Sequence, residues 1–238
     1  MLANSANSSA IVGTLKGDIH KPQTFLHELV GFISGELPKW RGRVERKAAT
    51  AETVLTSQLC AHLNSASRHA GGWDSLQFRV EEPDENQPGR RMDMVAAPTG
   101  TAIIVGGRRY VDFDTLLPVE CKRLPTPKDK ARDEREYVFC KHSSRGGIQR
   151  FKAGNHGSNH RLGAMIGYLQ ADGSTDWNTR INSWIDELAD VEAGWTAADR
   201  LAIGSLDASG GSATLASVHS RIGTLGDIEL RHLWIEMR

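Results

Sequence analysis

LPVECKRL, residues 117–124, is the stretch on which the interpretation of this chain depends. It is apolar enough for a buried strand, yet Glu120 and Lys122 stand two positions apart within it. Side chains alternate along a strand, so these two share one face, about 7 Å apart, opposite the face of Val119 and Cys121. By itself the pair is more typical of a solvated face of an antiparallel sheet. Its meaning therefore depends on the elements around it.

Helical patterns come first in the chain, and strand patterns lead up to LPVECKRL. Apolar residues at helical spacing predict one helix over 22–37, ended by Pro38, and a second helix that Thr50 can cap. Alternating patterns on either side of the turn-rich PDENQPG then predict strands. These strands are expected over 72–82, over 90–97, and as a strand or hairpin arm within 101–113.

After LPVECKRL the pattern returns to helix and strand. Residues 145–154 predict a short helix, 161–170 a buried strand and 174–190 an amphipathic helix. DRLAIGSLDA follows, and ATLASVHSRI and IELRHLWIEM then predict two paired strands around a turn. We expect an α/β fold, in the sense of an α+β arrangement with a mixed sheet. Residues 1–49 would form an N-terminal extension with a helix, and residues 50–238 the main domain with C-terminal strand additions, together one compact unit.

The composition indicates a globular, intracellular protein. With 238 residues and 39% hydrophobic content, the chain can bury a sizeable core. Its three cysteines lie far apart without a C-x-x-C pair, which favours reduced thiols. The first residues lack the pattern of a signal peptide, and no apolar run approaches the length of a membrane span. We expect a cytoplasmic location and no membrane partner.

Charge is balanced over the whole chain but not along it. Lys and Arg total 29, as do Asp and Glu, so no global basic field indicates a nucleic-acid partner. Residues 122–152 nevertheless hold ten Lys and Arg against four Asp and Glu. This segment is either a charged loop with partly cancelling ion pairs or a surface that contacts phosphates. No G-x-S-x-G elbow, P-loop or dinucleotide fingerprint points to another enzyme class.

Functional side chains recur along the predicted elements in a definite order. They are Glu52 on the second helix, Asp93 near the start of a strand, Glu120, Cys121 and Lys122 on LPVECKRL, and Gln149 on the short helix. This order resembles the PD-(D/E)XK nuclease superfamily, whose restriction-endonuclease-like fold has an αβββαβ core with an acidic residue and then an E-x-K strand. The resemblance covers about residues 50–170. Met92 stands where the family's motif has a proline before the acidic residue.

The resemblance implies a metal-dependent endonuclease that hydrolyses DNA phosphodiester bonds, of a kind that often serves bacterial defence against phage or mobile DNA. Such cleavage needs an attacking water and relief of negative charge, and Mg²⁺ suits this because it prefers oxygen ligands. By resemblance, Asp93, Glu120 and the backbone carbonyl of Cys121 hold Mg²⁺, or Mn²⁺ in its place. Lys122 then positions the attacking water or helps to deprotonate it.

Two further residues have both a functional and an ordinary interpretation. By resemblance, Glu52 is another metal ligand or orients a metal-bound water, but it also suits a first-turn acid that complements the helix dipole. Gln149 by resemblance contacts the water or the scissile phosphate, but it also suits a solvated polar position. Asp112 and Asp114 compete with Asp93 for the ligand role if the strand register differs.

Basic residues near the predicted site are the expected nucleic-acid contacts. They are Arg123, Arg145, Arg150 and Lys152, whose cations would contact phosphates without reading sequence. DNA is therefore the expected partner, with a homodimer or other proteins of a defence complex as further partners. An alternative from another class is a catalytically silent DNA-binding or scaffold subunit of a multi-protein defence or repair complex.

Histidines outside these motifs carry weaker expectations. His156 and His160 lie four apart, but the glycine and serine between them predict a loop that contacts the DNA backbone or serves as a tether, rather than a zinc pair. His219, Arg221 and His232 alternate on the predicted C-terminal strands. They suit a solvated sheet face as well as a nucleic-acid or partner surface.

Overall fold

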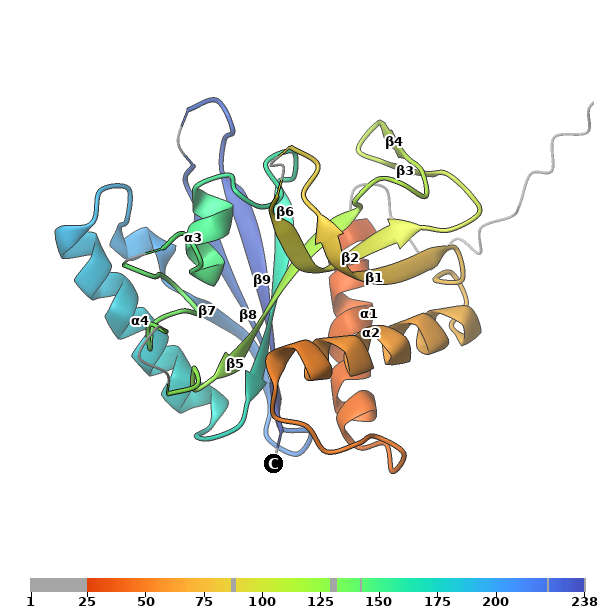
Figure 1. The fold of residues 1–238 in the computed structure, drawn as a ribbon, viewed down its shortest axis with the longest axis horizontal. Helices are drawn as coiled ribbons and strands as arrows, with labels where there is room; N and C mark the ends of the chain where they lie inside the picture. The colour runs from red at the N-terminus through yellow and green to blue at the C-terminus, as the bar shows by residue number, and fades with distance from the viewer. Residues whose placement is uncertain (1–24, 87–88, 129–131, 142, 222, 238) are drawn as a thin grey trace, which may run out of the picture.

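A seven-stranded sheet forms the centre of the protein (Figure 1). The computed structural model describes residues 25–237 except 87–88, 129–131, 142 and 222. Within them, four α-helices pack on a sheet with parallel and antiparallel pairs, which confirms the predicted α+β class with a mixed sheet. Across the sheet the strands are β1 (Leu76–Pro83), β2 (Arg91–Pro98), β5 (Leu117–Leu124), β6 (Leu162–Leu169), β9 (Ile228–Glu236), β8 (Ser212–His219) and β7 (Ala202–Asp207).

The strand directions divide the sheet into three parts. β1, β2 and β5 pair antiparallel, β5, β6 and β9 pair parallel, and β9, β8 and β7 pair antiparallel. The segment predicted as a strand or hairpin arm forms a separate hairpin of β3 (Ile103–Val105) and β4 (Arg108–Tyr110). LPVECKRL, which is β5, therefore lies inside the sheet between β2 and β6.

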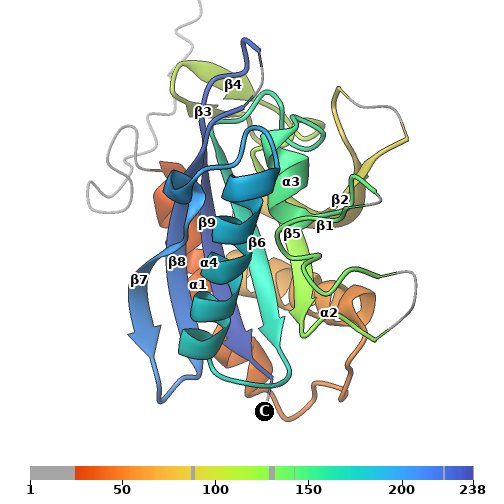
Figure 2. The same ribbon diagram turned by 90° about the vertical axis from the view of Figure 1, so that its left-hand side faces the viewer.

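Helices cover both faces of the sheet (Figures 1 and 2). α1 (Phe25–Arg41) and α2 (Glu52–His69) lie on one face, and α3 (Gly147–Lys152) and α4 (Ser174–Val191) lie on the other. Because both faces are covered, every residue of β6 is buried, which matches its continuous apolar sequence. None of the described helices is long and apolar enough to span a bilayer.

The N-terminal part of the described chain differs from prediction in two details. α1 continues through Pro38 to Arg41, because Trp40 is 1% exposed and its ring packs 5.8 Å from that of Tyr168. α2 begins at Glu52 without a side-chain cap, and the carbonyl of Thr50 instead accepts hydrogen bonds from the side chains of Arg123 in β5 and of Gln170, which follows β6. Residues 1–24 of the predicted extension lie outside the described residues.

The C-terminal strands differ more from the prediction than the N-terminal helices do. β8 and β9 pair antiparallel, as predicted, but β9 also inserts beside β6 and so belongs to the middle of the sheet. His219 and His232 are 0% exposed and Arg221 is 8% exposed. The expectation of a solvated or partner-binding face for these three residues is therefore wrong. Asp199, in the segment after α4, covers His219, and Arg221 is enclosed by carbonyls within residues 157–160 and 225–226.

Candidate active site

The two strands that carry the predicted acids separate at the site. The antiparallel ladder between β2 and β5 ends at the pair Met94 and Val119, and the chains then diverge. Beyond this point the amide of Cys121 donates to Asp93 Oδ2 at 2.8 Å. We call the region where these strands separate the fork, formed by Glu52, Asp93, Glu120, Cys121 and Lys122.

A second carboxylate completes the open edge of β5. The amide of Arg123 donates to Glu52 Oε2 at 2.9 Å, so the first turn of α2 supplies the acceptor that a neighbouring strand would otherwise provide. Glu52 and Asp93 therefore have a structural reason to face β5. Each of these carboxylates is held in place by a backbone amide of β5.

Four oxygen atoms surround the ammonium of Lys122. Its Nζ lies 2.7 Å from Glu120 Oε1, 3.4 Å from Asp93 Oδ2 and 3.6 Å from Glu52 Oε1. It also donates to the carbonyl of Cys121 at 3.1 Å. Lys122 is 4% exposed, so one buried cation holds together three carboxylates from three different elements.

Glu120 has two further partners on the side of α3. Arg150 Nη1 donates to Glu120 Oε1 at 2.5 Å. His156 Nδ1 lies 3.1 Å from Glu120 Oε2, although the ring is not aligned for a hydrogen bond, so this contact is electrostatic. Sequence reasoning assigned neither residue to Glu120, since the contact depends on how α3 and the loop after it pack on β5.

The charges shift the ionisation of the central residues in opposite directions. Burial favours a neutral Glu120, but Lys122, His156 and Arg150 outweigh it and hold the pKa of Glu120 at about 2. Burial, with the nearby charge of Glu120, raises the pKa of Asp93 to about 6 despite Lys122. Burial opposes the charged form of Lys122, yet the three carboxylates raise its pKa. The centre is therefore built to retain one positive charge among several oxygens.

The fork brings together five predicted residues but not all of them. Gln149 turns its amide oxygen away, to the amides of Cys140 and Gly146 at 3.2 Å each, and so fixes the start of α3. Asp114 accepts from the amide of Val111 near the β3–β4 hairpin, outside the fork. The predicted contact of Gln149 with water or phosphate does not fit this position.

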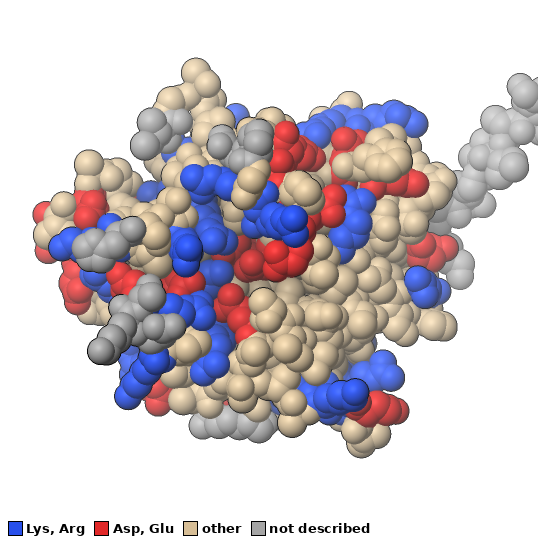
Figure 3. Space-filling view, in the orientation of Figure 1, with Lys and Arg blue, Asp and Glu red and all other residues tan. Residues whose placement is uncertain are grey.

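The four residues predicted to contact phosphate differ in their exposure and in their partners. Arg145 is exposed, Arg150 pairs with Glu120, and Arg123 donates to the carbonyl of Thr50 at 3.2 Å. Lys152 is 8% exposed and its Nζ lies 2.6 Å from Asp199 Oδ1, so its prediction as a phosphate contact is wrong. Figure 3 shows that Lys and Arg side chains nevertheless gather beside the acids between α3 and the start of α2.

Lys152 begins a buried chain of hydrogen bonds, which we call the polar chain. It runs through Asp199, His219, Ser217, His232 and Tyr137, with successive distances of 2.6, 2.6, 2.7, 2.7 and 2.8 Å. The order serine, histidine, aspartate resembles a nucleophile with its base. Ser217 is only 4% exposed, however, and its hydroxyl is shared by two imidazoles, so the polar chain joins α3 to the C-terminal strands.

The fork has the right donor type for a hard divalent cation. Its oxygens come from Asp93, Glu120, Glu52 and the carbonyl of Cys121, and Mg²⁺ prefers such ligands. In the described part of the chain, no three His, Cys, Asp or Glu side chains are spaced to hold a metal ion directly. In the fork, the oxygens of Glu120, Asp93 and Glu52 instead lie 2.7, 3.4 and 3.6 Å from the Lys122 ammonium.

Comparison with known proteins adds no family to this geometry. No family model matches the chain, no curated protein matches it in sequence, and no solved structure matches its fold. The functional assignment therefore rests on the fork.

Proposed function

We propose that the protein is a metal-dependent endonuclease that hydrolyses DNA phosphodiester bonds, with the fork as its catalytic centre. The observation that supports this is the convergence of four oxygens on the Lys122 ammonium where β2 and β5 separate. Oxygen ligands, a buried cation and neighbouring basic side chains suit a divalent metal and a phosphate together.

The proposal extends to the fold and the biological setting. Apart from the β3–β4 hairpin, which stands between β2 and β5, the elements α2, β1, β2, β5, α3 and β6 come in the order of the αβββαβ core of the PD-(D/E)XK superfamily. By that resemblance the substrate is DNA, the setting is bacterial defence in the cytoplasm, and a second copy or another protein completes the active assembly.

Each residue of the fork has a part in this chemistry. Asp93, Glu120 and the carbonyl of Cys121 would hold Mg²⁺, or Mn²⁺ in its place. When bound, the ion would act as a Lewis acid on the phosphate. The ammonium of Lys122 can only donate hydrogen bonds, so it orients the attacking water by its oxygen and stabilises negative charge on the phosphate. Glu52 holds the open edge of β5 through the Arg123 amide.

The test is cleavage of supercoiled plasmid and of linear single- and double-stranded DNA and RNA, with Mg²⁺, Mn²⁺ or EDTA. We expect cutting with either metal and none with EDTA. Glu120→Gln and Lys122→Met, which keep side-chain size, should each lower the rate by about 100-fold or more. Glu187→Gln removes an exposed carboxylate of α4 and is the matched control, expected to cut at the wild-type rate.

A second candidate is the catalytically silent DNA-binding or scaffold subunit. It is favoured because no three His, Cys, Asp or Glu side chains among the described residues are placed to hold a metal ion, and because the Lys122 ammonium already pairs with Glu120 at 2.7 Å. If the folded wild type cuts nothing under any of these conditions but retards DNA in a gel, the endonuclease proposal fails and this candidate replaces it.

A further inference from the structure

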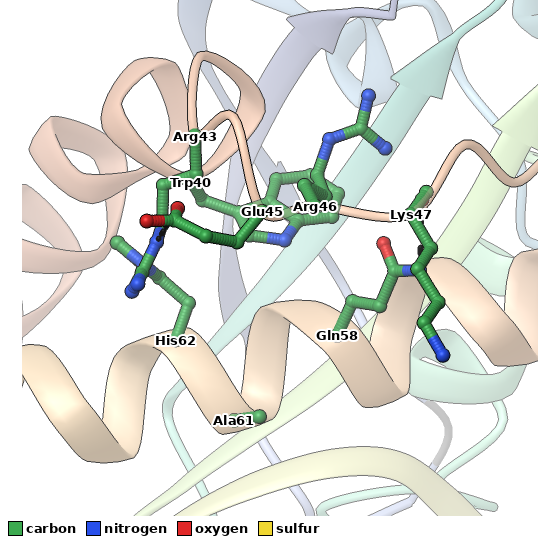
Figure 4. A pocket seen from close by; sticks show the side chains of 8 residues that line it. All are labelled: Trp40, Arg43, Glu45, Arg46, Lys47, Gln58, Ala61 and His62. Atoms are coloured by element: carbon green, nitrogen blue, oxygen red, sulfur yellow. Dashed lines mark hydrogen bonds and ion pairs between the residues drawn. The ribbon is translucent and has the colours of Figure 1, made fainter.

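A pocket of about 340 Å³ lies between α1 and α2, apart from the fork (Figure 4). Its walls are the last turn of α1, the segment that joins α1 to α2, and one face of α2. The side chains that matter here are Trp40, Arg43, Arg46, Lys47, Gln58 and His62. We call this site the interhelical pocket.

Polar atoms without partners line the interhelical pocket. Four buried atoms of its lining side chains have no hydrogen-bond partner among the described residues, namely Trp40 Nε1, Arg46 Nη1, Gln58 Oε1 and His62 Nδ1. A buried polar atom that stays unpaired costs about 1–3 kcal/mol, so four of them around one pocket need an explanation. A bound ligand that pairs with them would supply it.

Gln58 and His62 each have one polar atom that is already paired with another residue of the protein. Gln58 Nε2 donates to the carbonyl of Lys47 at 3.0 Å, which leaves its oxygen as the free end. His62 Nε2 lies 2.9 Å from a carboxylate oxygen of Glu36, which leaves Nδ1 as the free nitrogen. The pocket thus offers a donor from Trp40, an acceptor from Gln58 and, in the neutral ring, a second acceptor from His62.

This mixture of donor and acceptors selects against a simple anion. A phosphate or carboxylate oxygen would pair with the indole N–H of Trp40 but would be repelled by the lone pairs of Gln58 Oε1. A planar group with both N–H and ring-nitrogen or carbonyl positions satisfies both, and the edge of a nucleobase has this pattern.

The rim of the pocket is basic. Arg43, Arg46 and Lys47 stand beside one acid, Glu45, which leaves an excess of two positive charges. The Arg43 and Glu45 side chains pair at 3.4 Å while 46% and 69% exposed, and such an exposed pair contributes little. Both side chains can therefore turn aside and let an anionic ligand reach the buried atoms.

We propose that the interhelical pocket binds a nucleotide unit. Its base edge lies against Trp40 and Gln58, and its phosphate lies among Arg43, Arg46 and Lys47. The unit is either a free nucleotide or one unit of a nucleic-acid strand, since both present the same chemistry. The proposal does not depend on cleavage at the fork.

The test is calorimetric titration of the full chain in EDTA, which prevents metal-dependent cutting. The probes are the four 5′-mononucleotides, adenosine, ribose 5-phosphate and inorganic phosphate. We expect at least one mononucleotide to bind, with the probes that lack base or phosphate at least about tenfold weaker. Gln58→Leu should weaken nucleotide binding about tenfold, because it removes the acceptor. Gln58→Glu, which keeps an acceptor but adds charge near the phosphate, should also weaken it.

Arg109→Ala is the control, because it removes an exposed cation of β4 outside the pocket and should leave binding unchanged. A single-stranded hexanucleotide separates the two sources of the ligand. Binding at least about tenfold tighter than the mononucleotides, and lost in Gln58→Leu, identifies a strand, whereas equal or weaker binding identifies a free nucleotide. The proposal is overturned if inorganic phosphate binds as tightly as every nucleotide, if Gln58→Leu binds normally, or if no nucleotide binds at millimolar concentration.

Discussion

At the scale of single residues, Glu120 and Lys122 stabilise each other in the interior. Their side chains are 0% and 5% exposed and lie 2.7 Å apart. Removing one member of such a buried pair costs about 3–5 kcal/mol, because the other charge stays buried without compensation. Activity measurements on fork variants therefore need a parallel measurement of folding by circular dichroism.

We expect Lys122→Met to bind Mn²⁺ more tightly than the wild type, by about tenfold or more, while losing DNA cleavage. The ammonium competes with a metal ion for the oxygens of Glu52, Asp93 and Glu120, so its removal leaves a more negative site. Electron paramagnetic resonance of free Mn²⁺ measures the binding, with Glu187→Gln as the control. Equal or weaker binding by Lys122→Met would show that ammonium and metal do not share this centre.

The buried histidines of the polar chain predict a pH dependence of stability. Burial lowers the pKa of His219 and lowers that of His232 well below its usual value. Below about pH 6.5 the unfolded chain therefore takes up protons that the folded protein does not, and the free energy of unfolding falls as the pH falls. Asp93, with a raised pKa of about 6, takes up a proton in the folded state and acts in the opposite direction.

His232→Phe should therefore weaken this pH dependence. Urea unfolding at pH 7.5, 6.0 and 5.0 should give a variant that is less stable at pH 7.5 but loses less stability on acidification. The slope should differ by up to about 1.4 kcal/mol per pH unit. Parallel curves for variant and wild type would contradict the assignment of a buried, neutral His232.

Local spacing explains which site residues the sequence could predict. Glu120 and Lys122 share a strand face by alternation, and Asp93 is placed opposite by the antiparallel order of β2 and β5. Lys152 and His156 were not placed correctly, since their partners come from segments remote in sequence. The alternation of His219 and His232 looks the same in a solvated and in a buried strand.

At the scale of elements, the start of α3 packs closely against the preceding segment at Tyr137 and Phe139. A Cβ on Gly146 would lie 2.5 Å from Phe139 Cα, and one on Gly147 would lie 2.8 Å from the carbonyl oxygen of Tyr137. Both of these obstacles are backbone atoms, and a Cβ on Gly147 would also lie 2.5 Å from the side-chain tip of Met165. The two glycines therefore allow the start of α3, the helix that carries Arg150, to pack this closely.

Gly146→Ala should lower the free energy of unfolding by about 1–3 kcal/mol, because the added methyl group overpacks the start of α3. The matched control is Gly35→Ala in α1, where no heavy atom lies within 4 Å of the added Cβ. That change should raise stability by about 0.5–1 kcal/mol through better helix propensity. Thermal unfolding of both variants tests the pair, and equal behaviour would argue against close packing at α3.

Element boundaries show what periodicity can and cannot predict. The strong patterns predicted α2, β5, β6 and α4 as elements of the observed type. The end of α1 was misplaced at Pro38, because the packing of Trp40 on Tyr168 outweighs the local preference of proline. The position of β9 could not be predicted, since sequence order carries no information on which strands become neighbours.

At the scale of the whole molecule, the sheet has a protected centre and exposed edges. Every residue of β6 is buried, and most of β9 is, whereas every residue of β7 is exposed. We expect amides of β6 and β9 to exchange slowest with deuterium and those of β7 and the β3–β4 hairpin fastest. Mass spectrometry of peptic fragments measures this, and fast exchange in β9 would contradict its place beside β6.

The place of β9 also bears on how the protein is made. β9 completes the middle of the sheet but is synthesised after every other described element. During translation, one edge of β6 stays unpaired until residues 228–236 leave the ribosome. Until then the hydroxyl of Tyr137 also lacks its hydrogen-bond partner His232. A nascent chain would thus carry the fork residues for some time in a sheet whose middle is still incomplete.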